Sequence, residues 1–197
     1  SPGYTAAVEE YDGSSWTTVT SIPAAIDSMG ACGPQTNGMA FGGQQGGPNT
    51  NSTFEYDGTN WTSGGNLNTT RRDLIGAGTQ TAGLAALGAI DPPFTAEAEQ
   101  YNGTSWTTVA EANTGRRSAG GGGTSTSAMA YGGFAPPYTA NAETWNGSAW
   151  TEVSNISSIR GIMGGGGSSN TDQITFGGYG GPPGATRYAN TEFWDGT

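Results

Sequence analysis

The apolar positions of this chain fall in short runs in which apolar and polar residues alternate, and turn-forming residues separate one run from the next. In the middle of the chain, small residues at 118–123 are followed by a polar turn at 124–127 and by an apolar run at 128–131. Alternation with a period of two is typical of strands that bury one face. The pattern therefore predicts an all-β protein that is rich in turns.

One phrase of aromatic and turn residues recurs four times in a single frame. In each copy an aromatic residue is followed by Asp-Gly or Asn-Gly and, five positions after the aromatic, by a tryptophan. The four pairs are Tyr11 and Trp16, Tyr56 and Trp61, Tyr101 and Trp106, and Trp145 and Trp150. The tryptophans are 45, 45 and 44 residues apart, and glycines at 43, 88, 133 and 178 keep a period of 45. Two independent markers with nearly one period indicate structural repeats.

Each copy of the phrase is predicted to form a β-hairpin, because Asp-Gly and Asn-Gly tolerate the positive φ that tight turns need. Whether the loop has two or four residues, the aromatic before it and the tryptophan after it emerge on the same face and pack together. We therefore expect all eight residues to form a core between adjacent repeats. The alternative for the four tryptophans is a lectin-like arrangement with one sugar-stacking site per repeat.

A second pair of strands precedes each double glycine, so each repeat of about 45 residues contains four strands. Runs of Gly and Ala suit a crowded innermost strand, where backbones approach closely. Such units cannot bury both faces alone, and radial stacking in a β-propeller solves that problem. A solenoid or a sandwich is the alternative, but the shorter coils and parallel strands of a solenoid do not call for a hairpin in every unit. The sequence thus predicts an all-β propeller of four-stranded antiparallel blades, at least four in number.

These residues resemble the kelch repeat, in which an Arg precedes a strand of small residues, a hydrophobic strand ends in Gly-Gly, and a Tyr and a Trp follow. The likeness covers nearly the whole chain and is clearest from Arg116 through Gly132-Gly133 to Trp150. The first repeat departs from it, with Ile26-Asp27 in place of the Arg pair, and the second reads Leu87-Gly88-Ala89. The resemblance implies a single kelch-like propeller over residues 1–197.

The amino-acid sequence of the repeats is also similar to that of kelch-like arrays of marine bacteriophages, which look like tail-fibre or other virion appendage proteins. The phrase Thr-Glu-Phe-Trp-Asp-Gly-Thr at 191–197 is one example. This resemblance implies a virion or extracellular location. Because the sequence stops within a fifth copy of the phrase, we expect an excerpt of a longer chain. Blade number stays open between a four-blade ring closed by pairing the two ends and a longer propeller, which we favour.

The recurrent charged residues suggest ion pairs within the scaffold. Arg71-Arg72 and Arg116-Arg117 occupy one repeat position and are expected to pair with Glu97, Glu99 or Glu143. An anion-binding site is the alternative reading of the arginines. Acidic residues also recur two positions before the aromatic of the phrase, at Glu9, Glu99, Glu143 and Glu192. Periodic placement favours a scaffold role over a catalytic pair.

The charge and hydrophobicity of the chain limit the classes of partner that it can bind. The chain has 16 acidic residues, six Arg and no Lys or His, which gives a net charge of −10. It offers no basic surface for a phosphate backbone, an anionic membrane repels it, and it contains no long apolar run. We therefore expect no nucleic-acid partner and no membrane insertion. Cys32, the single cysteine, permits no intrachain disulfide and is interpreted as a small buried residue.

Catalytic signatures are weak. Without His, neither the Ser-His-Asp nor the Cys-His arrangement can form, and the usual His-rich metal sites are excluded. The turn residues Asp12 and Asp57 lack the spacing of a calcium loop and are interpreted as turn formers. We therefore expect no catalytic residues, no cofactor and no metal. A glycosidase that uses a carboxylate pair is the remaining enzymatic alternative.

Variation among the repeats is concentrated in the loops after the double glycines, which should all lie on one face of the propeller. In these loops proline pre-orders the chain, and exposed aromatic rings offer flat surfaces to a ligand. The candidate ligand-binding residues are Gln45, Asn49, Phe94, Tyr138, Tyr179 and Tyr188. We predict a non-enzymatic adhesion module that recognises a host-surface glycan or protein, displayed in several copies beside other virion proteins. A purely structural appendage module is the alternative.

Overall fold

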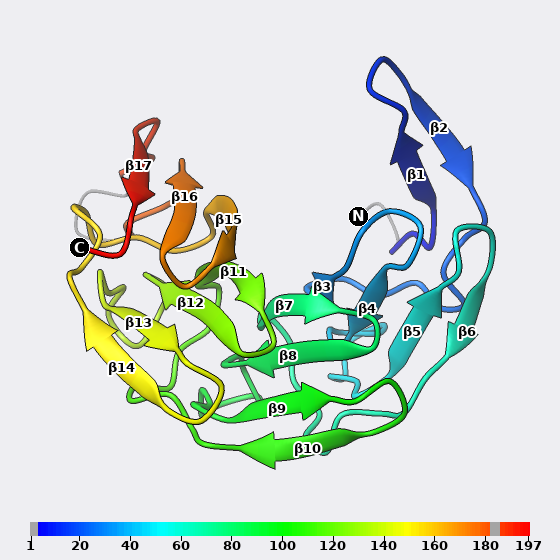
Figure 1. The fold of residues 1–197 in the computed structure, drawn as a ribbon, viewed down its shortest axis with the longest axis horizontal. Coiled ribbons are helices and arrows are strands. Elements are labelled where there is room, and N and C mark those ends of the chain that lie inside the picture. Colours follow the sequence, from blue (N-terminus) through cyan, green and yellow to red (C-terminus); the bar gives the residue numbers. More distant parts are fainter. Residues whose placement is uncertain (1–3, 182–185) are drawn as a thin grey trace.

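The computed structural model describes residues 4–181 and 186–197, and all of its regular elements are β-strands (Figure 1). The strands form five antiparallel sheets, which are arranged around a common centre as in a β-propeller. The predicted fold class is therefore confirmed. No helix in the described part of the chain is long and apolar enough to cross a membrane.

Three sheets are complete four-stranded blades. Blade 1 contains β3 (Gly30–Cys32), β4 (Met39–Phe41), β5 (Thr53–Tyr56) and β6 (Trp61–Ser63). Blade 2 contains β7 (Ile75–Thr79), β8 (Ala82–Ala86), β9 (Ala98–Tyr101) and β10 (Trp106–Val109). Blade 3 contains β11 (Gly120–Thr124), β12 (Ser127–Tyr131), β13 (Ala142–Trp145) and β14 (Trp150–Val153). Within each blade, consecutive strands are neighbours, as the repeat predicts.

The two ends of the described chain form smaller sheets. Blade 4 has the three strands β15 (Gly164–Ser169), β16 (Asp172–Phe176) and β17 (Thr191–Trp194). The N-terminal hairpin has two, β1 (Val8–Tyr11) and β2 (Trp16–Val19). These two sheets lie at opposite ends of an open arc (Figure 1) and are not paired with each other. The described residues thus do not form the four-blade ring closed by the chain's own ends.

The innermost strands β3, β7, β11 and β15 face the centre of the arc (Figure 1). They contain many small residues because neighbouring backbones approach closely there. At Gly76 in β7, a Cβ atom would collide with the backbone carbonyl oxygen of Ala31 in β3. The Gly and Ala runs therefore occupy the crowded position that the sequence predicted for them.

Each repeated phrase forms a hairpin with a four-residue loop. Tyr56 and Trp61 are direct partners across β5 and β6, and their ring centroids are 4.8 Å apart. The Asp57 side chain accepts hydrogen bonds from the backbone N–H groups of Thr59 at 2.8 Å and Asn60 at 2.7 Å. The same bonds occur at Asp12, Asn102 and Asn146. These residues are turn formers, as predicted.

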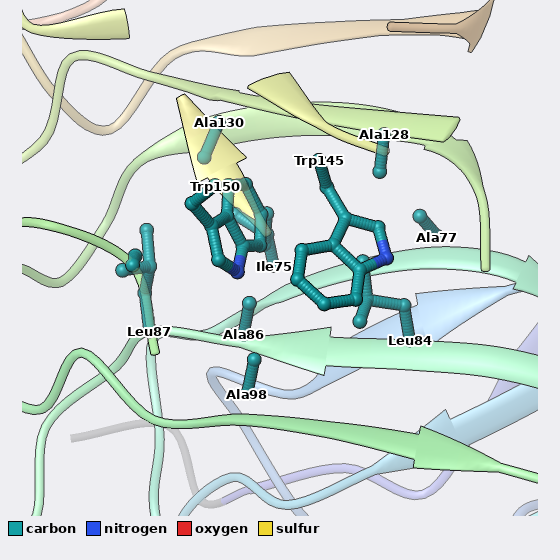
Figure 2. Close-up of a cluster of buried hydrophobic side chains, with 11 residues drawn as sticks. Ile75, Ala77, Leu84, Ala86, Leu87, Ala98, Ala128, Ala130, Trp145 and Trp150 are labelled. Carbon is teal, nitrogen blue, oxygen red and sulfur yellow. The ribbon is translucent and has the colours of Figure 1, made fainter. Parts of the chain in front are cut away.

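The tryptophans of the complete blades pack between neighbouring blades. Figure 2 shows Trp145 and Trp150 of blade 3 beside Leu84 and Ala86 of β8 in blade 2, and all four are buried. Trp106 is buried in the same way between blades 2 and 1, where its indole Nε1 donates to the Thr53 hydroxyl at 2.9 Å. Tyr56 and Tyr101 are buried, and Trp61 is half-buried.

The core prediction is wrong for the first copy of the phrase. The rings of Tyr11 and Trp16 pack against each other, with centroids 5.2 Å apart, but they are 47% and 68% exposed. The N-terminal hairpin supplies only two strands, and the described chain places no sheet on its outer side (Figure 1). An indole at this repeat position is buried only where a preceding blade covers it.

A buried ion pair connects adjacent blades, as the recurrent charges predicted. Arg71 donates to the Glu99 carboxylate of blade 2 at 2.9 Å, and its backbone carbonyl accepts from Gly43 N–H of blade 1 at 2.8 Å. The same carboxylate accepts from the backbone N–H of Asn68 at 2.7 Å. The arrangement recurs with Arg116 and Glu143 and with Arg160 and Glu192. We call each copy an Arg–Glu clamp.

Candidate ligand-binding face

The variable loops connect the second and third strands of the blades, so they all open on one face of the propeller. Isolated bridges fix each loop to the segment that enters its blade. Phe134, for example, pairs with Arg117 on one side and with Tyr138 on the other. The predicted loop at 179–183 lies partly outside the described residues. We call this side of the molecule the loop face.

Aromatic side chains form a continuous row across the loop face. Phe94 of blade 2 packs edge to face against Phe134 of blade 3, with ring centroids 5.5 Å apart. Phe134 then contacts Tyr138 at 4.9 Å, and Tyr138 contacts Tyr179 of blade 4 at 5.6 Å. All four side chains are half-buried. This aromatic row spans three blades, and each of its four side chains is partly exposed to solvent.

Arginine and aspartate side chains border the aromatic row. The guanidinium of Arg117 lies 5.5 Å from the ring centroids of both Phe94 and Phe134, a cation–π arrangement. Arg117 also donates to the Asp73 carboxylate at 2.9 Å. Arg72 lies 3.7 Å from the same carboxylate and forms a second ion pair with Asp91. Charged donors and acceptors thus lie next to flat apolar surfaces.

The backbone fixes the position of the aromatic row. A Cβ atom at Gly181 would lie 2.6 Å from the Tyr138 ring, and one at Gly161 would lie 3.0 Å from it. Tyr138 therefore occupies a slot that only glycine backbone leaves open. A site built in this way is largely preorganised, because binding need not order it first.

A concave space of about 450 Å³ opens near the centre of the arc. Ser28, Asp73, Ser118 and Ile162 occupy equivalent positions there in four blades, each with φ between 52° and 56°. Their backbone groups link the blades around the centre, since the Asp73 N–H donates to the Ser28 carbonyl and the Ser118 N–H donates to the Asp73 carbonyl, both at 2.9 Å. Asp73 lines this space and also belongs to the ionic border of the aromatic row.

Of the six predicted ligand-binding residues, the structure places three in the aromatic row and three elsewhere. Phe94, Tyr138 and Tyr179 lie in the aromatic row. Asn49 instead joins blade 1 to blade 2, since it donates to the Ala89 carbonyl at 3.1 Å and accepts from Arg72 at 2.7 Å. The remaining two lie outside the row: Gln45 is exposed at the tip of the blade 1 loop, and Tyr188 packs under the guanidinium of Arg160.

Sequence reasoning missed Phe134, Arg117 and Asp73 as members of one site. A periodic signal was present for Phe134, because the position directly after each double-glycine site reads Gln44, Ala89, Phe134 and Tyr179. Two of these four residues are aromatic, and they occur in adjacent repeats. The contribution of Asp73 depends on the contact between blades 2 and 3, which no local pattern reveals.

Other chemistry finds little support among the described residues. These residues contain no group of three or more His, Cys, Asp or Glu side chains placed to hold a metal ion. Cys32 is half-buried, and burial raises the pKa of its thiol to about 12. A thiol that stays protonated at neutral pH is a poor nucleophile. Cys32 therefore fits the predicted packing role.

The fold and the loop face define the chain as a β-propeller with a candidate site built from loops. Among solved structures, 175 chains are similar. One, titled "Structure of YjhT", matches with a TM-score of 0.72 and 14% sequence identity, and the match covers 90% of this chain and 68% of that one. At this identity the likeness concerns the fold alone. No family model and no curated protein matches the sequence.

Proposed function

We propose that this chain is a non-enzymatic binding module that recognises a cell-surface glycan through the aromatic row on its loop face. We place the module on a virion appendage, such as a tail fibre. Support for that setting comes from the resemblance of the repeats to kelch-like arrays of marine bacteriophages. The observation that carries the binding function is the aromatic row itself, because it continues across three blades.

Glycan recognition suits the chemistry of this face. Aromatic rings present flat apolar surfaces to the C–H faces of sugar rings, and neighbouring polar groups fix the orientation of the ligand. Here Tyr138 and Tyr179 would supply the stacking surface. Arg117 and Asp73 would supply hydrogen-bond donors and acceptors for hydroxyl groups. Weak affinity at a single site would be offset by display in several copies.

A glycan array probed with the protein coupled to beads tests the proposal. Tyr138→Ala and Tyr179→Ala should each weaken binding to any recognised glycan at least about tenfold, because each removes a stacking ring. Thr59→Ala is the matched control, since Thr59 is exposed on a hairpin at the opposite end of the strands. It should bind as the unchanged protein does. Circular dichroism and unfolding midpoints establish that each variant is folded.

Two results would contradict the proposal. One is the absence of any bound glycan when the beads carry many copies, which favours a purely structural module. The other is binding that survives both tyrosine substitutions in folded protein, which would move the site away from the aromatic row. Release of free sugar from a bound glycan would instead favour the glycosidase alternative.

A further inference from the structure

The charged side chains beside the aromatic row neutralise one another within blades 1 to 3. Arg117 donates to the Asp73 carboxylate at 2.9 Å, and Arg72 forms an ion pair with Asp91. Arg72 also donates to the Asn49 side chain at 2.7 Å. Two guanidinium groups and two carboxylates thus leave this part of the loop face without net charge, although it contains two arginines.

The guanidinium of Arg117 is held from several sides. Its central carbon lies 5.5 Å from the ring centroids of both Phe94 and Phe134. Its Nε is buried and has no hydrogen-bond partner among the described residues. Asp73 holds the Nη1 end, and the whole side chain is 36% exposed. An anionic ligand that approaches this guanidinium therefore meets a carboxylate that already binds it.

The propeller scaffold does not require a carboxylate at position 73. The equivalent residues of the other blades are Ser28, Ser118 and Ile162, and they have the same left-handed backbone as Asp73. They form the same backbone links as well, since the Ile162 N–H donates to the Ser118 carbonyl at 2.9 Å. The Asp73 side chain instead contacts the arginines of the loop face. Its charge therefore belongs to the candidate site.

We propose that Asp73 makes the loop face selective for uncharged glycans and against glycans that carry a carboxylate, sulfate or phosphate group. This inference rests on the proposed glycan-binding function. An acidic group would have to displace Asp73 from Arg117, and the exposed Asp27 and Asp91 add repulsion on the same face. The net charge of −10 acts in the same direction. Asp73 thus determines specificity by acting through Arg117.

One further arginine lies at the end of the aromatic row. Arg187 is the bridge partner of Tyr179, is exposed, and forms no ion pair among the described residues. A site centred on Arg187 would make the reverse prediction, namely a preference for acidic sugars. The experiment therefore has to separate Arg187 from Arg117.

The test compares pairs of glycans that differ only by one carboxylate or sulfate group. The unchanged protein should bind the uncharged member at least about tenfold more tightly. Asp73→Asn should lower this ratio at least about fivefold, because it frees Arg117 and because Asn tolerates the left-handed backbone. Asp73→Ser, which copies the equivalent residue of blades 1 and 3, should have the same effect.

Asp57→Asn is the matched control, because it changes the net charge by the same amount in a hairpin at the opposite end of the strands. It should leave the ratio unchanged, and so should Arg187→Ala. Equal effects of Asp57→Asn and Asp73→Asn would overturn the proposal, since net charge alone would then set the selectivity. A preference for acidic glycans that Arg187→Ala abolishes would overturn it in favour of Arg187.

Inorganic phosphate supplies a readout that needs no glycan. The side-chain Nε–H resonance of Arg117, assigned with Arg117→Lys, should stay in place when millimolar phosphate is added to the unchanged protein. It should move in Asp73→Asn. Movement in the unchanged protein would overturn the charge selectivity whether or not any glycan binds. A resonance that moves only in Asp73→Asn, together with an empty glycan array, would support the selectivity and contradict the glycan-binding function.

Discussion

Single side chains in the hairpin loops do much to set the shape of a blade. The Asp57 carboxylate accepts two backbone N–H groups, and these hydrogen bonds lower its pKa below the ordinary value of 3.8. The equivalent residue in blades 2 and 3 is Asn102 or Asn146, whose amide oxygen accepts the same two bonds without titrating. The same turn is thus stabilised by a charged carboxylate in some repeats and by a neutral amide in others.

This difference predicts distinct pH responses. Because the pKa of Asp57 is lower in the folded chain, its stabilising contribution is complete above about pH 4 and is lost as the pH falls through the lowered value. Asp57→Asn should flatten the dependence of urea unfolding on pH between about pH 4 and pH 2. Asn102→Asp should make it steeper. Identical pH profiles in all three proteins would show that the turn carboxylate does not contribute.

At the scale of elements, the Arg–Glu clamp joins successive blades, and blade 1 replaces it with an apolar version. The positions of Arg71 and Glu99 correspond to Ile26 and Phe54, which belong to one buried cluster. The position of Asn68, whose N–H bonds the Glu99 carboxylate, corresponds to Pro23, which has no N–H to satisfy. All three parts of the clamp are changed together. An apolar replacement of a buried ion pair is often neutral, whereas loss of one partner is costly.

The clamp therefore predicts strong coupling in a double-mutant cycle. Arg71→Ile alone should lower the free energy of unfolding by about 3–5 kcal/mol, because it leaves Glu99 buried without its partner. Arg71→Ile with Glu99→Phe should recover most of that loss, and Asn68→Pro should then be tolerated. Urea denaturation measures each value. Additive effects of the two substitutions would show that the residues act independently.

At the scale of the whole molecule, each blade is stabilised by the blades on either side of it. Blade 2 has both faces covered, and its strands β8 and β9 are almost entirely buried. The N-terminal hairpin and blade 4 each have one open side (Figure 1). In repeat proteins, stability is close to a sum of unit and interface contributions, so units with one interface are weaker.

Hydrogen exchange should follow this gradient. Amides of β1, β2 and β17 are expected to exchange at least about tenfold faster than those of β8 and β9, because local opening at the ends breaks fewer contacts. Mass spectrometry of peptides from each sheet measures the rates. Uniform protection along the chain would indicate that the two ends are covered in solution.

The periodic residues made most of the fold predictable. Trp106 and Trp150 recur at a fixed step, and the hairpin geometry of a single repeat pairs each of them with the aromatic residue before its turn. The predicted burial was wrong for Trp16, because burial depends on a neighbouring blade and not on the residue's own repeat. In the candidate site, Phe94 and Tyr138 were predictable as loop aromatics. Their connection through Phe134 and Arg117 was not, since these contacts cross from one blade to the next.

The sequence by itself determined the repeat length, the hairpins and the antiparallel blades, because these depend on side-chain alternation and turn chemistry within about 45 residues. Only the tertiary structure decided which equivalent residues are buried, how the aromatic row runs across the loop face, and where the arc stays open. Those features arise where one blade packs on another. Residues that are far apart in the chain come into contact at these interfaces, and no local sequence pattern specifies which of them do so.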